Sequence, residues 1–486
     1  STDTEVVAEL MNYLIEEGAS PLESMKEITS RIEGNYALVF LVKSSNNLYF
    51  SRKGSPLVVG ISKTFKCVAS DTLALPNKVD NIIYLEEGDI GEIGLDRANI
   101  FDRSFNLKEN QIHKHSSMQE HTTKRNFKHF MIKEIHYQSK SIDDTLLNFA
   151  KKNDEKIYLP QFKFDTKKID NLSLVACGTA FHACMVSKYW FEEISKINTM
   201  VEIASEYRYR ENSINKKTLG ILVSQSGETM DTIKCLEKMK KQKIHTASIV
   251  NVLGSSLSRN SDYIFPTIAG PEIGVASTKA FLGQMMVIYL LCLKISYLRN
   301  NIKKSDYNKK IKNLDLLSEK VKKTIFDENQ IQTISNTFSK AKGSMFLGRG
   351  YSFPIALEGA LKLKELAYVH AEGYPAGEMK HGPLALIEDG MPVVVLAPRD
   401  QYYKKTISNM QEVIARGAKV LLITNKSKEE VYSENIWQTI EVENTSEDLF
   451  PFLVTVPLQK LAYYSALKKG YDIDKPRNLA KSVTVE

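Results

Sequence analysis

The stretch that decides the fold is residues 218–232, TLGILVSQSGETMDT. Its apolar run, residues 219–223, predicts a buried parallel strand, and residues 232–241 predict a helix. The loop between them, residues 224–229, carries three hydroxyls, an amide and a glycine. A loop between the end of a strand and the start of a helix offers free N–H groups and the positive end of the helix dipole to an anion.

We interpret this loop as the binding site of a phosphate group. The loop has no lysine and no GxxxxGK[ST] pattern, which favours a single phosphate monoester over a nucleotide. An ordinary Ser/Thr cap on a surface turn is the alternative.

From about residue 165 onward, apolar runs alternate with helical segments, a pattern typical of a doubly wound parallel sheet. The pattern occurs twice, at an offset of about 170 residues, which indicates a duplicated α/β domain. The predicted strands are 172–176, 219–223, 245–250 and 263–266 in the first copy, and 344–347, 392–397, 419–424 and 439–442 in the second. The predicted helices are 181–194, 232–241 and 278–298, then 355–367, 402–416 and 449–469.

The residues before this repeat have a different pattern. Residues 1–105 combine a capped amphipathic helix with short β-type runs, which predicts an α+β region with antiparallel sheet. Residues 106–162 are polar, and we interpret them as a linker followed by helix. They hold five of the nine histidines, but the irregular spacing and the lack of cysteine do not favour a metal site.

Bulk properties exclude several classes of function. The net charge of +7 is spread over lysine-rich helices without a basic, aromatic-rich stripe, so we expect no nucleic-acid partner. Five scattered cysteines fit reduced thiols in the cytoplasm. No signal peptide opens the sequence, and the apolar stretch 281–295 is too short to span a bilayer, so we expect a cytoplasmic protein without a membrane partner.

Ligands of duplicated α/β domains bind where strands end. In the first copy these positions are rich in hydroxyls: Thr179 follows the first strand, the phosphate loop follows the second, and Val275 and Ser277 follow the fourth. We expect the backbone of Val275 and the side chain of Ser277 to hold sugar hydroxyls. A helix cap is the alternative at each position.

The second copy contributes titratable groups on the helix 357–367, LEGALKLKELA. Glu358, Lys362 and Glu365 have the i, i+4, i+7 spacing of one helical face. A solvated salt bridge is the simple interpretation. The functional one is a carboxylate base, Glu365, beside the ammonium group of Lys362, for moving a proton next to a carbonyl.

Two further segments carry candidate residues. We interpret residues 370–383 as a glycine-rich loop, in which the Gly-Pro after His381 would hold that histidine rigid for acid–base opening of a sugar ring. The C-terminal segment carries apolar residues that favour packing over fraying, and its Lys481 could form a Schiff base with a ketone.

Six segments together resemble one enzyme family: ACGTAFH, LVSQSGETMDT, GPEIGVASTKAF, FLGRGYSFPIALEGALKLKELAYVHAEGY, GEMKHGPLALI and PRNLAKSVTVE. The family is the isomerising glutamine–fructose-6-phosphate aminotransferases, also called glucosamine-6-phosphate synthases, and the resemblance covers nearly the whole chain. It implies two tandem sugar-isomerase (SIS) domains with doubly wound parallel sheets, preceded by a partial α+β glutaminase domain of the N-terminal-nucleophile type.

The resemblance also implies a role for each matching residue. In the family, the sugar phosphate is held by the residues that correspond to Ser224, Gln225, Ser226 and Thr229. The match to Glu365 shuttles a proton between carbons 1 and 2, with Lys362 beside it. The family residue that corresponds to Lys481 forms the imine with the sugar. The one that corresponds to His381 opens the sugar ring from a partner subunit, so a homodimer is expected. No metal or other cofactor is expected.

Two departures from the family pattern bear on activity. Ala180 stands where the family has a serine, so we expect weaker sugar binding. The sequence begins inside the glutaminase domain: Asp71 matches the carboxylate that holds the glutamine amine, but the N-terminal nucleophilic cysteine is absent. Neither Ser1, which precedes a helix, nor the internal Cys67 can replace that cysteine. We therefore expect no glutamine hydrolysis from these residues, which would be a fragment, half of a split protein or a relict.

The expected domains are 1–105 (partial glutaminase), 106–162 (linker), 163–303 (first SIS), 304–334 (helical connector), 335–476 (second SIS) and 477–486 (catalytic tail). The expected function is conversion of fructose 6-phosphate to glucosamine 6-phosphate, with glutamine or free ammonia as nitrogen source, at the first step of amino-sugar synthesis. A sugar-phosphate isomerase and a non-catalytic sugar-phosphate-binding protein are the alternatives.

Overall fold

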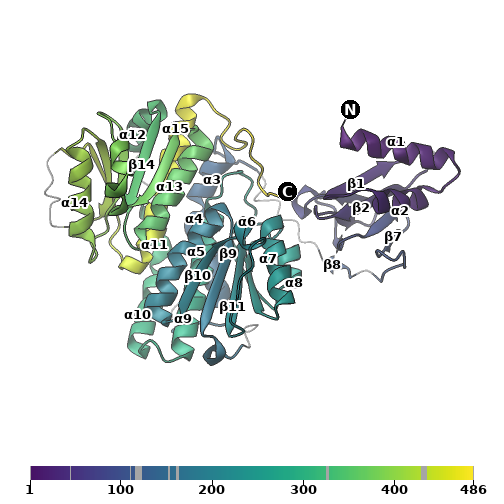
Figure 1. The fold of residues 1–486 in the computed structure, drawn as a ribbon, viewed down its shortest axis with the longest axis horizontal. Helices are drawn as coiled ribbons and strands as arrows, with labels where there is room; N and C mark the ends of the chain where they lie inside the picture. Colours follow the sequence, from purple (N-terminus) through teal and green to yellow (C-terminus); the bar gives the residue numbers. More distant parts are fainter. Residues whose placement is uncertain are drawn as a thin grey trace. The chain divides into compact units, whose positions relative to one another are not determined.

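The computed structural model describes residues 2–43, 45–109, 111–114, 123–151, 154–159, 164–324, 328–427 and 435–484. The chain forms two compact units (Figure 1). Ser1–Thr122 together with Ser482–Glu486 make the N-terminal unit, and Thr123–Lys481 make the main unit.

The N-terminal unit stacks two helices on two antiparallel sheets. The helices are α1 (Asp3–Glu16) and α2 (Pro21–Arg31), each started by a capping box. One sheet has the order β1 (Tyr36–Leu41), β2 (Leu48–Lys53), β6 (Ile90–Ile93) and β7 (Ala98–Phe101). The other has the order β4 (Lys66–Ala69), β3 (Val58–Ile61), β5 (Asn81–Tyr84) and β8 (His113–Lys114).

Strand pleating explains this layering. On β2, Tyr49 points to the core shared with α1 and α2, whereas Phe50 points to the core between the sheets. The predicted α+β region with antiparallel sheet is therefore confirmed.

The main unit contains two five-stranded parallel sheets. The first has the order β10 (Asn198–Ile203), β9 (Asn171–Ala176), β11 (Thr218–Ser224), β12 (His245–Val250) and β13 (Tyr263–Pro266). The second has the order β15 (His370–Pro375), β14 (Gly343–Gly348), β16 (Pro392–Leu396), β17 (Lys419–Asn425) and β18 (Gln438–Val442). The same order in both sheets confirms the predicted duplication of a doubly wound α/β domain.

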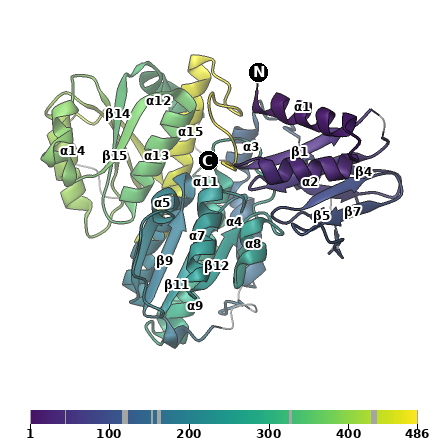
Figure 2. The same ribbon diagram turned by 45° about the vertical axis from the view of Figure 1, so that its right-hand side comes forward.

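Helices cover both faces of each sheet. One face of the first sheet packs on α4 (Gln138–Phe149), α5 (Gly178–Trp190) and α9 (Lys279–Leu298), and the other on α6 (Ala204–Tyr207), α7 (Met230–Lys241) and α8 (Ser256–Asn260). One face of the second sheet packs on α12 (Glu328–Lys340), α13 (Ser352–Ala367) and α15 (Phe450–Lys469), and the other on α14 (Tyr403–Ile414), as Figures 1 and 2 show.

The inner helices of the two halves share one core. Apolar side chains of α5, α9, α13 and α15 belong to a single buried cluster. At its centre the Trp190 ring stacks on Phe452, with centroids 6.0 Å apart, and meets Tyr289 edge-on at 4.9 Å. Because both sheets rest on this shared layer, the halves of the main unit are held as one body.

The segment interpreted as a linker contributes to that core. It contains α3 (Phe130–His136) as well as α4, and Met131, Ile135 and Ile142 are fully buried in the shared cluster. The two halves are joined by α10 (Lys304–Asp315) and α11 (Leu317–Lys323). The described residues also form a π-helical turn, η4 (Phe191–Ser195), and short 3₁₀ turns: η1 (Thr72–Ala74), η3 (Thr166–Lys168), η5 (Glu378–His381), η6 (Pro383–Leu386) and η7 (Glu447–Leu449).

One local prediction is wrong. Residues 370–375, interpreted as loop, form the edge strand β15, which pairs in parallel with β14. An edge strand buries less of its surface than a central one, so His370–Pro375 needs no apolar run and reads as loop in the sequence.

Helix α9 is long and apolar enough to cross a membrane by length and composition alone. However, 83% of its most apolar window is buried inside the protein. Packing between the first sheet and α4 and α5 accounts for this composition, as in the core helix of a large α/β protein.

Asp448 joins the two halves electrostatically. It accepts hydrogen bonds from the Tyr289 hydroxyl and the Lys310 ammonium, each at 2.5 Å, while its backbone oxygen accepts from Trp190 Nε1 at 3.0 Å. Burial would raise the pKa of Asp448, but the charge and hydrogen bond of Lys310 outweigh burial and lower it.

We predict that Asp448→Asn lowers the free energy of unfolding by about 3 kcal/mol, because it leaves the ammonium of Lys310 without its charged partner. The lowered folded-state pKa means that this stabilisation is present above the pKa of an unfolded aspartate and is lost as pH falls through the folded value. Urea unfolding at neutral and acidic pH measures both effects. The control, Asp170→Asn, removes an exposed pair with Lys217 and should cost less than about 1 kcal/mol. Equal effects of the two variants would contradict the role of Asp448.

Candidate active site

The predicted phosphate loop follows β11 at the carboxyl edge of the first sheet. Ser224, the last residue of β11, shares a hydrogen bond with the hydroxyl of Thr229 at 3.0 Å, and its oxygen accepts from the N–H of Gly227 at 3.0 Å. The hydroxyl of Ser226 accepts from the N–H of Glu228 at 3.1 Å. Three hydroxyl groups therefore lie in one tight turn before α7, next to the positive end of that helix.

Gly227 is required by the shape of this loop. Its φ is +68°, and a Cβ atom there would lie 2.0 Å from the Ser255 hydroxyl. Next to it, Glu228 accepts a hydrogen bond from the N–H of Ser256 at 2.7 Å. The loop is thereby clamped between β11 and α8.

Thr179 and the helix α13 meet across the two halves. Lys362 is fully buried, and its Nζ donates to Glu365 Oε2 at 2.5 Å and to Thr179 Oγ1 at 3.0 Å. Glu358 lies 3.5 Å from the same nitrogen and accepts from Thr179 at 3.1 Å. Burial would lower the pKa of Lys362, but the charges of Glu365 and Glu358 outweigh it and raise that pKa.

The network is therefore a buried ion-paired cluster, and the solvated salt bridge considered from the sequence is wrong. Lys362 is charged and holds Glu365 in place, while Glu365 keeps about a quarter of its side chain (23%) exposed. An ammonium beside a partly exposed carboxylate can polarise a carbonyl and move a proton.

Lys481 lies at a second charged cluster. Its Nζ donates to Glu272 Oε2 at 2.6 Å and to the carbonyl oxygen of Gly274 at 2.8 Å. Glu272 also accepts from Ser277 Oγ at 3.0 Å, from the N–H of Thr278 at 2.9 Å and from that of Ala280 at 3.0 Å, so it caps the start of α9.

Glu272 is a fixed negative charge. Although burial would raise its pKa, the charge and hydrogen bond of Lys481 and the N–H groups of Ala280 and Thr278 lower it to about 2. Val275, two residues before Ser277, donates its N–H to the carbonyl oxygen of Asp474 at 3.1 Å. Two hydrogen bonds, from Lys481 to Gly274 and from Val275 to Asp474, thus hold the C-terminal segment against the loop 274–277.

These groups lie at or beside one edge of the first sheet. Thr179 follows β9, the phosphate loop follows the neighbouring β11, and the Lys481 cluster follows β13. The arrangement brings a hydroxyl-rich loop, a buried ammonium–carboxylate pair and an amine to this edge, and groups of these kinds can bind an anion and move a proton.

Comparisons with known proteins bear on the family and the fold of the chain. A model of the SIS domain family matches residues 167–294 and 337–469. The chain is 43% identical, over its full length and 80% of the relative, to proteins named glutamine–fructose-6-phosphate aminotransferase (isomerizing) from Bradyrhizobium diazoefficiens and Brucella abortus.

The chain belongs to the glutamine–fructose-6-phosphate aminotransferase family. The resemblance stated from the motifs is thereby confirmed, as is the fold of two SIS domains.

Solved structures support the same assignment. The C-terminal domain of glucosamine-fructose-6-phosphate aminotransferase from Francisella tularensis aligns with a TM-score of 0.71 at 43% identity, covering 73% of this chain and all of that one. A glucosamine-6-phosphate deaminase from Thermotoga maritima aligns with a TM-score of 0.56 at 24% identity over 73% of this chain and shows the fold alone.

Some predicted residues lie outside these clusters. Gln225 contributes its backbone oxygen, which accepts from the N–H of Asn251 at 3.0 Å. His381 ends the turn η5, is exposed, and has no hydrogen-bond or ion-pair partner among the described residues. Asp71 precedes η1 in the N-terminal unit and is exposed. Ala180, the departure from the family pattern, packs against the shared core.

The metal interpretation finds no support in the part of the chain that the structure describes, where no group of three or more His, Cys, Asp or Glu could hold a metal ion. Of the five clustered histidines, His115 and His121 lie outside the described residues, as does Ser1.

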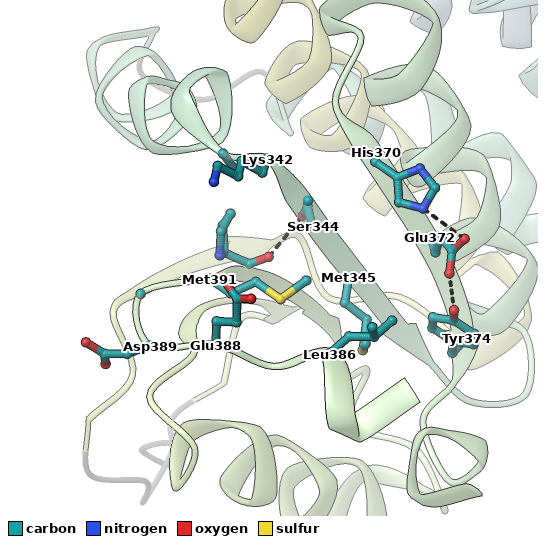
Figure 3. A pocket seen from close by; sticks show the side chains of 14 residues that line it. Lys342, Ser344, Met345, His370, Glu372, Tyr374, Leu386, Glu388, Asp389 and Met391 are labelled. Atoms are coloured by element: carbon teal, nitrogen blue, oxygen red, sulfur yellow. Dashed lines mark hydrogen bonds and ion pairs between the residues drawn. The ribbon is translucent and has the colours of Figure 1, made fainter. Parts of the chain in front are cut away.

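A separate cavity of about 460 Å³ opens at the amino edge of the second sheet (Figure 3). Figure 3 shows Glu372 on β15 between His370, with which it pairs, and Tyr374, whose hydroxyl donates a hydrogen bond to it. Glu388 and Asp389 lie on the opposite loop. Because carboxylates line it and the strand carboxyl ends lie at the other edge, this cavity is a poor site for a sugar phosphate.

Several residues of the site were missed from the sequence. Glu272 lies in the quoted segment GPEIGVASTKAF, two residues before Gly274, yet its role emerges only from the fold that brings Lys481 to it. His182 lies in ACGTAFH, where its Nδ1 meets Glu358 Oε2 at 2.7 Å. One helical turn after Thr179, His182 faces the same partner, and this spacing is the signal that could have found it.

We predict that Gly227→Ala weakens binding of inorganic phosphate by about tenfold, because left-handed backbone costs a residue with a Cβ about 1–2 kcal/mol and the new methyl group displaces Ser255. Calorimetric titration with phosphate measures the change. The control Gly470→Ala has a similar φ of +71° with no atom near the added Cβ, so it carries the backbone strain without touching the loop. Unchanged phosphate affinity in Gly227→Ala would contradict the assignment of the loop.

Proposed function

We propose that the protein converts fructose 6-phosphate into glucosamine 6-phosphate, with glutamine or free ammonia as nitrogen source, at the entry to amino-sugar synthesis. The names of its relatives support the reaction. The observation that carries it is the Lys481 ammonium, held 2.6 Å from a buried carboxylate beside the loop that follows β13.

Binding begins at the phosphate. In this mechanism the hydroxyls of Ser224, Ser226 and Thr229, with Gln225, hold the phosphate at the positive end of α7. Thr179, Val275 and Ser277 contact the sugar. His381 of a second copy of the chain opens the furanose ring, by giving a proton to the ring oxygen and accepting one from the C2 hydroxyl.

The open-chain ketone then reacts with Lys481. The amine adds to C2 and water leaves, which gives an imine; ammonia displaces the lysine in the same way. Glu365 removes a proton from C1 and returns it to C2, so the ketose imine becomes a 2-amino aldose. No cofactor is required, because the imine itself acidifies the proton on C1.

The ion-paired cluster around α13 suits this proton transfer. Lys362 lies 2.5 Å from Glu365, so its positive charge stabilises the negative charge that develops on the substrate when C1 loses its proton. Glu358, His182 and Thr179 hold Lys362 in position from both halves of the main unit. Asp71 of the N-terminal unit is the proposed contact for the α-amine of glutamine.

The reaction is tested by incubating the protein with fructose 6-phosphate and either ammonium or glutamine, and assaying glucosamine 6-phosphate. Product with ammonium supports the synthase, and product with glutamine as well adds glutamine hydrolysis. Interconversion of fructose and glucose 6-phosphates without amino sugar indicates an isomerase, and binding without either product would leave a sugar-phosphate-binding protein.

We predict that Lys481→Ala abolishes glucosamine 6-phosphate formation while fructose 6-phosphate still binds, because the phosphate loop is untouched. Product assays and calorimetric titration separate the two effects. Lys475→Ala, which removes an exposed lysine of the same segment, is the matched control and should keep full activity. Normal turnover in Lys481→Ala would refute the imine.

We propose that the active form is a homodimer in which His381 acts on the partner's site. Lys481→Ala and His381→Ala should each be inactive alone. Randomly mixed, the two variants should regain about a quarter of wild-type activity, because half the dimers then contain one intact site. Mixtures that stay inactive, despite exchange of subunits shown by mass spectrometry, would place His381 in the same subunit as Lys481.

The five cysteines are all free thiols. Free thiols fit a protein of the reducing cytoplasm, where we place this enzyme.

A further inference from the structure

Glu134 is a buried carboxylate for which the proposed mechanism has no use. It lies on α3, ahead of both matched SIS ranges, and is 3% exposed. Its Oε1 accepts from the N–H of Ile273 at 2.6 Å and from that of Gly274 at 3.3 Å. Gly274 is the residue whose carbonyl oxygen holds Lys481. One peptide segment therefore connects the two side chains.

The second oxygen of Glu134 is unusual. Oε2 is buried and has no hydrogen-bond partner among the residues that the structure describes. A Cβ atom added to Gly274 would lie 3.0 Å from it. A buried carboxylate normally has both oxygens satisfied, so this atom is open to receive a proton.

The groups facing Glu134 come from several elements. Glu272 precedes α9, Lys279 starts α9, Lys481 comes from the C-terminal segment, and Lys133 is its neighbour on α3. Burial and the charge of Glu272 raise the pKa of Glu134 to about 7, against the opposing effect of Lys481 and Lys279. Loss of positive charge at Lys481 would therefore raise the affinity of Glu134 for a proton further.

Glu272 cannot take this role. Both of its oxygens already accept hydrogen bonds, from Lys481 and Ser277 on one and from Thr278 and Ala280 on the other. Its charge is the form that these donors stabilise, and its pKa of about 2 follows from them. Of the two carboxylates beside the lysine, only Glu134 is suited to pick up a proton near neutral pH.

We propose that Glu134 is the proton store of the Lys481 amine: it takes up the proton that Lys481 must release before it can attack the sugar, and it returns that proton later. An ammonium has no lone pair, so the imine requires this release. The inference rests on the proposed function. Glu134 touches no substrate atom and is therefore a positioning residue for charge.

The step balances in two parts. First, Lys481–NH₃⁺ and Glu134–COO⁻ become Lys481–NH₂ and Glu134–COOH. Second, the amine forms a C–N bond to C2, the carbonyl oxygen leaves as water, and the proton stays on Glu134 until ammonia displaces the lysine, when it returns to the Lys481 amine. No oxidant, reductant or further reactant is needed.

The test is the rate at which borohydride traps the fructose 6-phosphate imine on Lys481, measured by mass spectrometry from pH 5.5 to 8.5. Three forms are compared: wild type, Glu134→Gln and Glu134→Asp. Glutamine keeps the acceptor oxygen for Ile273 and Gly274 and the shape of the side chain, but it cannot hold the proton. Aspartate keeps a titratable carboxylate.

In the wild type we expect trapping to slow as pH falls through about 7, because a protonated Glu134 accepts no further proton. Glu134→Gln should lose this part of the pH dependence and trap on the order of a hundredfold more slowly at pH 8, with KM for fructose 6-phosphate unchanged. Glu134→Asp should keep the pH dependence. These results support the proposal.

A pH dependence that is the same in wild type and Glu134→Gln would overturn it. Should the glutamine variant not fold, an infrared difference spectrum of the wild type decides: binding of fructose 6-phosphate at pH 8 must produce one protonated carboxyl band, and its absence overturns the proposal. No trapped imine in the wild type at any pH is a different failure, since it removes the proposed function itself.

Discussion

The structure depends on the contact between the Lys481 ammonium and the buried carboxylate of Glu272. A charged carboxylate without a partner would strongly destabilise the folded protein at this position, because the side chain of Glu272 is inaccessible to water. Glu272 therefore needs several donors, which are the hydroxyl of Ser277, the N–H groups of Thr278 and Ala280, and the ammonium of Lys481, the sixth residue from the end of the chain. The start of α9, the loop 274–277 and the C-terminal segment are fixed to one another by this requirement.

Asp474 reinforces that constraint. Its carboxylate accepts from the N–H groups of Phe130 and Met131, both at 3.0 Å, and so caps α3. Its backbone oxygen accepts from Val275. The same segment of eight residues, 474–481, thus begins at the helix that carries Glu134 and ends at the lysine. The two copies of the domain contribute different groups to the proposed site: the first provides the phosphate loop, whereas the second provides the charged face of α13.

Much of this arrangement could be predicted from the sequence. The central strands β9, β11 and β12 could be predicted because burial on both faces requires continuous apolar runs. The edge strands are partly exposed and are less bound by this rule: β10 and β15 were missed, whereas β13 and β18 were predicted. Hydroxyls in a strand–helix loop were found by local chemistry, whereas Glu134, Glu272 and His182 matter only through partners between 139 and 209 residues away along the chain. Glu134 was the hardest case, because polar flanking residues made its segment resemble a linker.

The most direct measurement is carbon-13 NMR of fructose 6-phosphate labelled at C2 and bound to the protein without ammonia. The account predicts that the C2 resonance of the bound sugar moves from the position of a ketone or hemiketal to that of an imine, and that Lys481→Ala prevents this shift while phosphorus-31 NMR still reports a bound phosphate. A bound sugar whose C2 remains a ketone or hemiketal in the wild type would contradict it.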